Sequence, residues 1–228
     1  MTRRSIGIHI QCRLGSSRLP GKVLLPLGGR RLLGWVVHRC QGSEEADALQ
    51  LAVGNRPENE AIVEWAKRNE VSFVQGSEEN LLERHLSIAD QHGADTIVRI
   101  TGDCPFVPSS EIDQVIQAHR SNEAGYTTNA VEDMPTGFAV DVIDVQVLRE
   151  LSELGDTHPV ARLRDNPDKW HVAFTSDERW SAFAALDVSI DTPADYWRME
   201  DAVSAVRSNP AEVCEWVLNR AESRPANQ

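Results

Sequence analysis

The chain has very little lysine, and its acidic residues outnumber its basic ones. Of 228 residues, 23 are Lys or Arg and 35 are Asp or Glu, which gives a formal net charge of −12. Its lysines are Lys22, Lys67 and Lys169. A surface of this charge repels the phosphate backbone of DNA and RNA. The charge therefore argues against general nucleic-acid binding, and a local cluster of cations must attract any anionic substrate.

Cysteine-based and membrane-spanning architectures are also missing from the sequence. The four cysteines (Cys12, Cys40, Cys104 and Cys214) are far apart and form no C-x-x-C pair, so the sequence predicts neither a zinc site nor a disulfide framework. No apolar run approaches the roughly 18 residues that span a membrane. No apolar signal segment precedes the first expected strand, and we expect a cytoplasmic, reduced protein that binds no membrane.

The order of apolar and amphipathic segments predicts an α/β fold. Short apolar strands alternate with longer helices, which is typical of an open, mainly parallel sheet covered by helices on both faces. We expect one domain over 1–221 and a frayed tail at 222–228. The irregular segment at about 130–180 is a candidate insertion or arm. The expected strands are 5–11, 49–53, 72–75, 96–100, 125–129, 138–143, 171–175 and 185–190. The expected helices are 31–40, 58–69, 79–92, 110–122, 145–154, 193–206 and 210–220.

The segment 11–22, QCRLGSSRLPGK, is typical of a loop that holds phosphates. Glycines let backbone N–H groups approach oxyanions, and cations neutralise charge at the same place. The loop is not a P-loop, because five residues separate its glycines and Val23 follows Lys22 where a hydroxyl is needed. It also lacks the dinucleotide fingerprint G-x-G-x-x-G. The alternative is a solvated turn between strand and helix. The candidate phosphate ligands are Gln11, Arg13, Gly15, Ser16, Arg18 and Lys22.

Two carboxylates follow later apolar strands. Ligands of an open parallel sheet bind beyond the carboxyl ends of the strands, which selects Thr101 and Asp103 in the segment RITGDCP at 99–105. A carboxylate at this place suits Mg²⁺ beside a triphosphate. In isolation Asp103 fits a turn cap before Pro105 better, and its pairing with the loop at 11–22 favours the metal. Asp191 follows the expected strand 185–190. There the competing explanation is a helix cap made by Thr192 and Asp195.

These three segments resemble the cytidylyltransferase-like family of spore-coat and surface-polysaccharide synthesis, which is related to the CMP–sugar-acid (acylneuraminate and KDO) synthetases. The loop is similar to R-x-G-S-x-R-L-P-G-K, residues 99–105 to R-I-T-G-D-C-P, and residues 190–195 to the V-D-T-P-E-D ending. The resemblance covers roughly residues 5–200. It implies a Rossmann-like nucleotidyltransferase fold of the GT-A type, Mg²⁺ on Asp103 and Asp191, and Arg13, Lys22 and Asp103 as catalytic residues. It further implies CTP as nucleotide, an acidic sugar or sugar phosphate as acceptor, pyrophosphate release, and a possible homodimer.

The chain departs from the family pattern in two places. Gly54 stands where relatives carry a hydroxyl, and the acceptor segment around 134–141 lacks the usual acids. Asp141 and His158 are the residues that we expect to bind the acceptor. Two other functions stay open at this stage. One is a glycosyltransferase of related fold, although the D-x-D motif usual in such enzymes is absent. The other is a nucleotide-binding regulator without catalysis.

Overall fold

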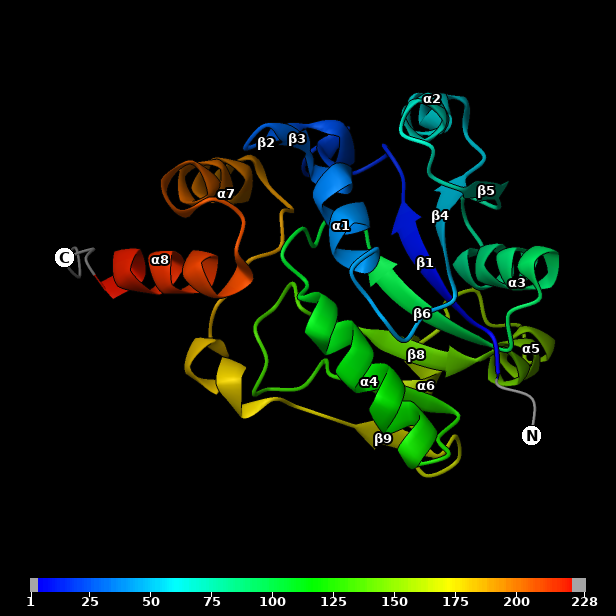
Figure 1. Cartoon of the computed structure of the whole chain (residues 1–228). Helices are drawn as coiled ribbons and strands as arrows, with labels where there is room; N and C mark the ends of the chain where they lie inside the picture. The colour runs from blue at the N-terminus through cyan, green and yellow to red at the C-terminus, as the bar shows by residue number, and fades with distance from the viewer. Residues whose placement is uncertain (1–3, 223–228) are drawn as a thin grey trace.

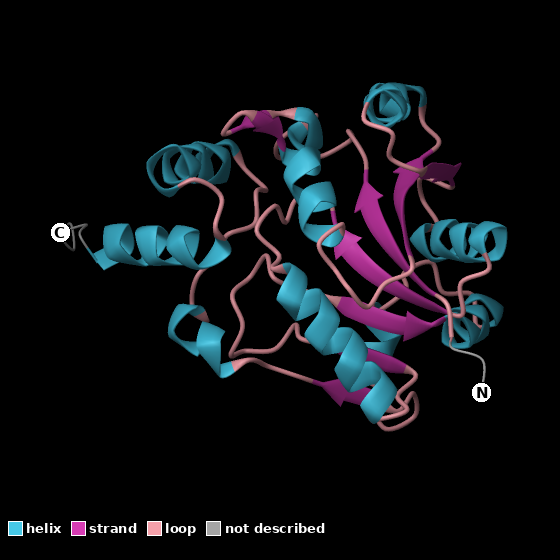
Figure 2. Ribbon diagram, viewed as in Figure 1, coloured by secondary structure: helices cyan, strands magenta, loops and turns pink. Residues whose placement is uncertain are grey.

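A seven-stranded sheet forms the centre of the molecule (Figures 1 and 2). The structure is a computed structural model that describes residues 4–222. The strand order is β5-β4-β1-β6-β8-β7-β9, and β8 runs antiparallel to its neighbours β6 and β7 while the other pairs are parallel. The predicted mainly parallel sheet is thus confirmed. The bounds are β1 Ile6–Cys12, β4 Ala48–Gly54, β5 Phe73–Gly76, β6 Thr96–Thr101, β7 Tyr126–Thr128, β8 Asp141–Asp144 and β9 Val172–Phe174.

Helices cover both faces of the sheet, as the sequence predicts. On one face lie α1 (Leu32–Cys40), α2 (Glu60–Arg68) and α4 (Ser109–Ser121). On the other lie α3 (Leu81–His92), α5 (Val145–Glu153) and α6 (Ala161–Asp165). α7 (Pro193–Val206) and α8 (Pro210–Glu222) pack on each other and lie beyond the carboxyl end of β6 (Figure 1). Short elements complete the chain: the hairpin β2 (Pro26–Leu27) and β3 (Arg30–Arg31), and the 3-10 turns η1 (Lys22–Leu24), η2 (Pro57–Asn59) and η3 (Glu178–Phe183).

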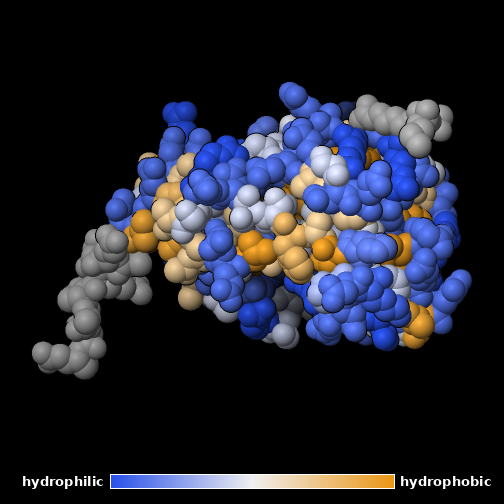
Figure 3. All heavy atoms as spheres, turned by 90° about the horizontal axis from the view of Figure 1, so that it is seen from below, coloured by the Kyte–Doolittle hydropathy of each residue, from blue (hydrophilic) through white to orange (hydrophobic). Residues whose placement is uncertain are grey.

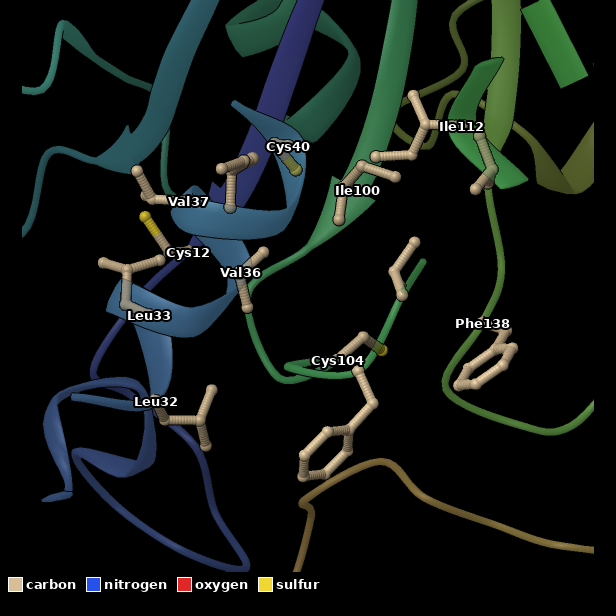
Figure 4. Close-up of a cluster of buried hydrophobic side chains, with 14 of the residues drawn as sticks. Cys12, Leu32, Leu33, Val36, Val37, Cys40, Ile100, Cys104, Ile112 and Phe138 are labelled. Atoms are coloured by element: carbon tan, nitrogen blue, oxygen red, sulfur yellow. The ribbon is translucent and has the colours of Figure 1, made fainter. Parts of the chain in front are cut away.

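The alternation of side chains along β1 separates an apolar face from a polar one. Ile8, Ile10 and Cys12 enter the larger core, where Figure 4 shows Cys12 beside side chains of α1. Burial raises the pKa of the Cys12 thiol to about 12, so this side chain stays neutral and packs as an apolar group. His9 and Gln11 lie on the opposite face. The core contacts of Ile8, Ile10 and Cys12 therefore hold β1 in place, and with it the polar residues on its opposite face.

Three expectations about the chain need correction. Residues 185–190 form no strand: Asp187 makes only an isolated bridge with Thr136, although Leu186, Val188 and Ile190 alternate into the core. The alternation indicated the buried face correctly, but no neighbouring strand pairs with this segment. The segment 130–180 is not an arm outside the sheet, because it supplies β8 and β9. Of the expected tail 222–228, residue 222 ends α8 and the rest lies outside the described residues.

The surface carries few large apolar side chains. Within residues 4–222, no helix is both long and apolar enough to cross a membrane. The face seen in Figure 3 is mainly hydrophilic, with hydrophobic residues gathered in a narrow band across its middle. The large apolar residues that are exposed in the described chain are Leu154, Phe174 and Trp197. They belong to the end of α5, to β9 and to α7, and so to three separate elements.

Two histidines pair in the interior between β1 and α3. His9 and His85 are both 0% exposed, their rings are stacked with centroids 5.4 Å apart, and their Nδ1 atoms are 3.2 Å apart. One ring must donate through Nδ1–H and the other accept, so at least the accepting ring must be neutral. Burial, and then the charge of His92, lower the pKa of His9 to about 3. Burial, His9 and the arginines Arg99 and Arg84 lower the pKa of His85.

Stability is expected to fall on acidification because of this pair. In the unfolded chain these histidines take up protons near pH 6.5, whereas in the folded chain they do not. Their contribution to the free energy of unfolding is therefore fully present above pH 6.5 and is lost as the pH falls toward 3. Between pH 6.5 and 4.5, His9 alone accounts for about 2–3 kcal/mol. Urea unfolding across this range measures the slope. The double variant His9→Leu/His85→Leu should flatten it, whereas the exposed control His171→Asn, away from this pair, should not. An unchanged slope in the double variant would show that the pair does not cause it.

Candidate active site

Three distant parts of the chain meet at one cavity beyond the carboxyl ends of β1 and β6. Its volume is about 250 Å³. The loop after β1, the end of β6 and the segment before α7 supply its walls. The lining residues are Gln11, Cys12, Arg13, Ser16, Ser17, Arg18, Lys22, Val23, Thr101, Gly102, Asp103 and Asp191. This edge of an open α/β sheet is where ligands bind in such folds.

Hydrogen bonds at Leu14 fold the loop after β1 back on itself. The Leu14 carbonyl accepts from the N–H groups of Ser16 at 2.8 Å and Gly21 at 2.9 Å. The Leu14 N–H donates to Oδ1 of the buried Asn59 at 2.8 Å. Gly21 has φ = 74°, a left-handed conformation that favours glycine, and it immediately precedes η1. The turn at Gly21 therefore returns the side chain of Lys22, the first residue of η1, to the cavity.

Lys22 joins the two carboxylates that the sequence selects as metal ligands. Its Nζ lies 2.6 Å from Asp103 Oδ2 and 2.7 Å from Asp191 Oδ1. Arg18 adds a second cation, 2.9 Å from the same oxygen of Asp191. The side chain of Lys22 is only 9% exposed, against 27% for Asp103 and 30% for Asp191. The sequence predicts all of these residues at one edge of the sheet, but it does not predict that the lysine bonds the carboxylates.

The mutual contact keeps this cluster charged at neutral pH. Burial alone would lower the pKa of Lys22, but the charges and hydrogen bonds of Asp103 and Asp191 outweigh it and raise that pKa above its usual value. Burial alone would also raise the pKa of Asp103, yet the charge and hydrogen bond of Lys22 leave it below its usual value. Lys22 and Asp103 therefore face each other as an ammonium and a carboxylate at the cavity floor.

Asn59 and Glu78 contact the loop through Leu14 and Arg13, a role that the sequence did not predict. Glu78 is 9% exposed, and its Oε2 accepts from Asn59 Nδ2 at 2.8 Å. Arg13 reaches the other carboxylate oxygen of Glu78 at 3.7 Å. A Cβ atom on Gly54 would lie 1.6 Å from Glu78 Oε2, so Glu78 occupies the space that a side chain at position 54 would need. The glycine in place of the hydroxyl residue of relatives is the one sequence signal of this arrangement.

A second polar network begins at Gln11 and runs away from the cavity under α6. Gln11 Oε1 accepts from Arg99 Nε at 2.9 Å, and Arg99 donates through a terminal nitrogen to Asp141 Oδ2 at 2.7 Å. Since arginine only donates hydrogen bonds, Gln11 must present its oxygen to Arg99. Gln11 also lines the cavity, and its NH₂ group can donate to an acceptor bound there.

The environment of Asp141 does not fit the direct acceptor contact expected from the sequence. Asp141 is 1% exposed, and burial, outweighed by Arg99 and Arg164, leaves its pKa below the usual value. Both of its oxygens are already hydrogen-bonded, Oδ2 by Arg99 and Oδ1 by Tyr126 (2.6 Å), Thr128 (2.9 Å) and Arg164 (2.8 Å). Asp141 therefore orients the arginines rather than offering an oxygen to a sugar.

His158 is accessible in the loop between α5 and α6. Partial burial of its ring, followed by the positive charge of Arg99, lowers its pKa.

The residues that the sequence selects for the site fall into two groups, those that line the cavity and those that do not. Eight of them line it: Gln11, Arg13, Ser16, Arg18, Lys22, Thr101, Asp103 and Asp191. The other three, Gly15, Asp141 and His158, are not lining residues. Asp191 also precedes the predicted cap, since Thr192 and Asp195 form a capping box at α7.

The sheet order, the glycine-rich loop and the carboxylates beyond β6 define an α/β nucleotidyltransferase. Residues 7–192 match the cytidylyltransferase family, and the chain belongs to that family. The family expected from the sequence motifs is thereby confirmed, and with it the assignment as a nucleotidyltransferase enzyme.

Individual relatives agree with this assignment. The spore coat polysaccharide biosynthesis protein SpsF of Bacillus subtilis (strain 168) is 32% identical over 82% of this chain and 81% of its own length. A cytidylyltransferase structure from Leptospira borgpetersenii serovar Hardjo-bovis superposes with a TM-score of 0.89 at 25% identity, covering 99% of this chain and 100% of that one. CMP:2-keto-3-deoxy-manno-octonic acid synthetase, solved with CTP, has a TM-score of 0.71 at 17% identity and covers 88% and 99%. This last likeness concerns the fold.

Replacing Asp141 by Asn should destabilise the fold strongly. The change removes the buried negative charge that Arg99 and Arg164 share, and breaking a buried pair from one side costs about 3–5 kcal/mol. The free energy of unfolding in urea measures the loss. Asp90→Asn, which breaks an exposed pair with Arg149, is the matched control and should cost less than about 1 kcal/mol. Equal stability of the two variants would refute the orienting role of Asp141.

Proposed function

We propose that this protein transfers CMP from CTP to an acidic sugar or sugar phosphate, with Mg²⁺, and releases pyrophosphate. The product would be a precursor for surface-glycan synthesis. The observation that carries the proposal is the convergence of Asp103 and Asp191 on one point, at the foot of a loop that presents Arg13 and Arg18 to the same cavity. Carboxylates for a cation and cations for a triphosphate stand side by side, as nucleotidyl transfer requires.

The donor set at this point fits a divalent cation. The Lys22 ammonium occupies the position of a cation between two carboxylate oxygens, 2.6 and 2.7 Å away. Mg²⁺ prefers oxygen ligands and is usually held by one or two carboxylates together with substrate phosphates and water. Asp103 and Asp191 would hold the ion, and bound there it would offset negative charge at the α-phosphate.

The loop residues would bind the triphosphate. Arg13 and Arg18 have exposed side chains at the cavity rim, 56% and 62% exposed, and guanidinium groups match phosphate oxygens well. Lys22 adds a point charge from below, and Ser16 and Thr101 line the wall with hydroxyl groups. Because the net charge of the chain opposes anions, this local excess of cations has to supply the attraction.

The reaction needs positioning more than covalent help from the protein. An acceptor oxygen forms a bond to the α-phosphorus, the bond from that phosphorus to the bridging oxygen of the β-phosphate breaks, and pyrophosphate leaves with the electron pair. If the acceptor is a hydroxyl, its proton is released to solvent. Holding both substrates in line and neutralising charge supply the rate enhancement.

The acceptor would bind on the side of the Gln11 network. Gln11 offers its NH₂ group to the cavity, and the Arg164 side chain is 39% exposed above the buried Asp141. His158 lies in the loop that precedes α6. This wall presents hydrogen-bond donors, which suit the carboxylate of an acidic sugar. The CTP preference rests on family membership and on the related synthetase solved with CTP.

Lys22→Ala and Asp103→Asn should each lower turnover by about 100-fold or more, because each removes a charge aimed at the reacting phosphates. Pyrophosphate release from CTP in the presence of a panel of acidic sugars measures the rate. Lys67→Ala, a change at an exposed lysine, is the matched control and should retain the parental rate. Circular dichroism verifies that each variant is folded. Folded variants at Lys22 and Asp103 with near-parental rates would overturn the assignment.

A further inference from the structure

The groups proposed to bind the nucleotide and the groups proposed to bind the metal neutralise each other. Lys22 bonds both Asp103 and Asp191, and Arg18 bonds Asp191 as well. Two positive charges thus face two negative charges within 3 Å. Each of these carboxylates and cations already has a partner of opposite charge, so a ligand of either sign must compete with an existing contact.

A divalent cation arriving alone meets an unfavourable situation. To reach both carboxylates it must displace the Lys22 ammonium, whose side chain is 9% exposed. The displaced ammonium would then lie beside the incoming positive charge with no anion to receive it. Charge repulsion at such short range is strong in a partly buried site. The resident lysine therefore opposes binding of the free metal ion.

A triphosphate arriving alone meets the mirror image of this situation. For Lys22 and Arg18 to turn fully to the phosphates, they must leave Asp103 and Asp191. The two carboxylates would then be left uncompensated beside a highly charged anion. When both ligands arrive together, the cations exchange the carboxylates for phosphate oxygens and the carboxylates exchange the cations for the metal. Every charge keeps a partner only in this case.

We propose that Lys22 is the resident counter-ion of Asp103 and Asp191, and that its exchange makes the site selective for the metal-bound triphosphate over either component alone. The inference deepens the proposed function and depends on it for the identity of the two ligands. It assigns Lys22 a role before catalysis, in addition to phosphate binding. Metal and triphosphate must then strengthen each other's binding by the same factor.

The first experiment measures the metal without any nucleotide. Mn²⁺ is titrated into the protein and the free ion is followed by electron paramagnetic resonance. Lys22→Met should bind Mn²⁺ at least about 5-fold more tightly than the parent, within the usual 5- to 150-fold range of coupling effects. Lys67→Met, at an exposed lysine paired only loosely with Glu60 at 3.9 Å, is the control and should not change the affinity. Equal Mn²⁺ affinity of Lys22→Met and the parent contradicts the inference.

The second experiment measures the anion without metal, so that the conclusion does not depend on one variant that folds poorly. Inorganic tripolyphosphate is titrated calorimetrically in the presence of a chelator. Asp103→Asn frees Lys22 from one partner and should bind the anion at least about 5-fold more tightly than the parent. Asp168→Asn, at an exposed position, removes one negative charge elsewhere and is the control. No gain in Asp103→Asn relative to this control overturns the inference.

Failure of this inference and failure of the proposed function give different results. Tripolyphosphate carries no base or sugar, so both experiments test the charge exchange whatever nucleotide the enzyme uses. Magnesium-dependent CTP binding, together with no effect of Lys22→Met on the affinity for Mn²⁺, would support the proposed function and refute the charge exchange. The predicted effects on Mn²⁺ and tripolyphosphate, with no binding of CTP, would leave the exchange and remove the function.

Discussion

The contact of Lys22 with Asp103 and Asp191 is the interaction on which the arrangement of the site depends. It joins residues that are 81 and 169 positions apart in the chain. Each partner is brought there by a different device: Gly21 turns the chain before Lys22, β6 ends just before Asp103, and the cap of α7 follows Asp191. The charge cluster is thus formed where three elements meet. Lys22 and Arg18 together balance Asp103 and Asp191 in a partly buried place where an isolated charge would be costly.

Two buried carboxylates, Glu78 and Asp141, hold residues in place on opposite sides of the cavity. On the side of β4 and β5, Asn59 accepts a hydrogen bond from the loop at Leu14 and donates one to Glu78, which fills the space beside Gly54. On the side of β8, Asp141 holds Arg99, which in turn fixes the amide of Gln11. In both cases a carboxylate that is away from the cavity orients a residue that lines it. These contacts restrict the motion of the residues that line the cavity. Catalysis by positioning requires such restriction.

The sequence predicted what depends on local signals. Alternating strands and helices gave the sheet and its coverage, and the loop glycines and the Thr192–Asp195 cap marked positions at the ends of elements. Residues with no local partner could not be predicted in the same way. The alternation at 185–190 resembles a strand, yet pairing needs a neighbour that the sequence does not name. Asp141 was expected at the acceptor because of its place in the family segment, but its four donors come from β6, β7 and α6.

The most direct measurement is a calorimetric titration of the protein with CTP, UTP, GTP and ATP, each with and without Mg²⁺. A cytidylyltransferase site built from these carboxylates and cations predicts preferred binding of CTP that depends on Mg²⁺. Such a result would justify a search through acidic sugars as acceptors. Binding of no triphosphate, together with binding of a nucleoside-diphosphate sugar, would contradict the account and favour a glycosyltransferase.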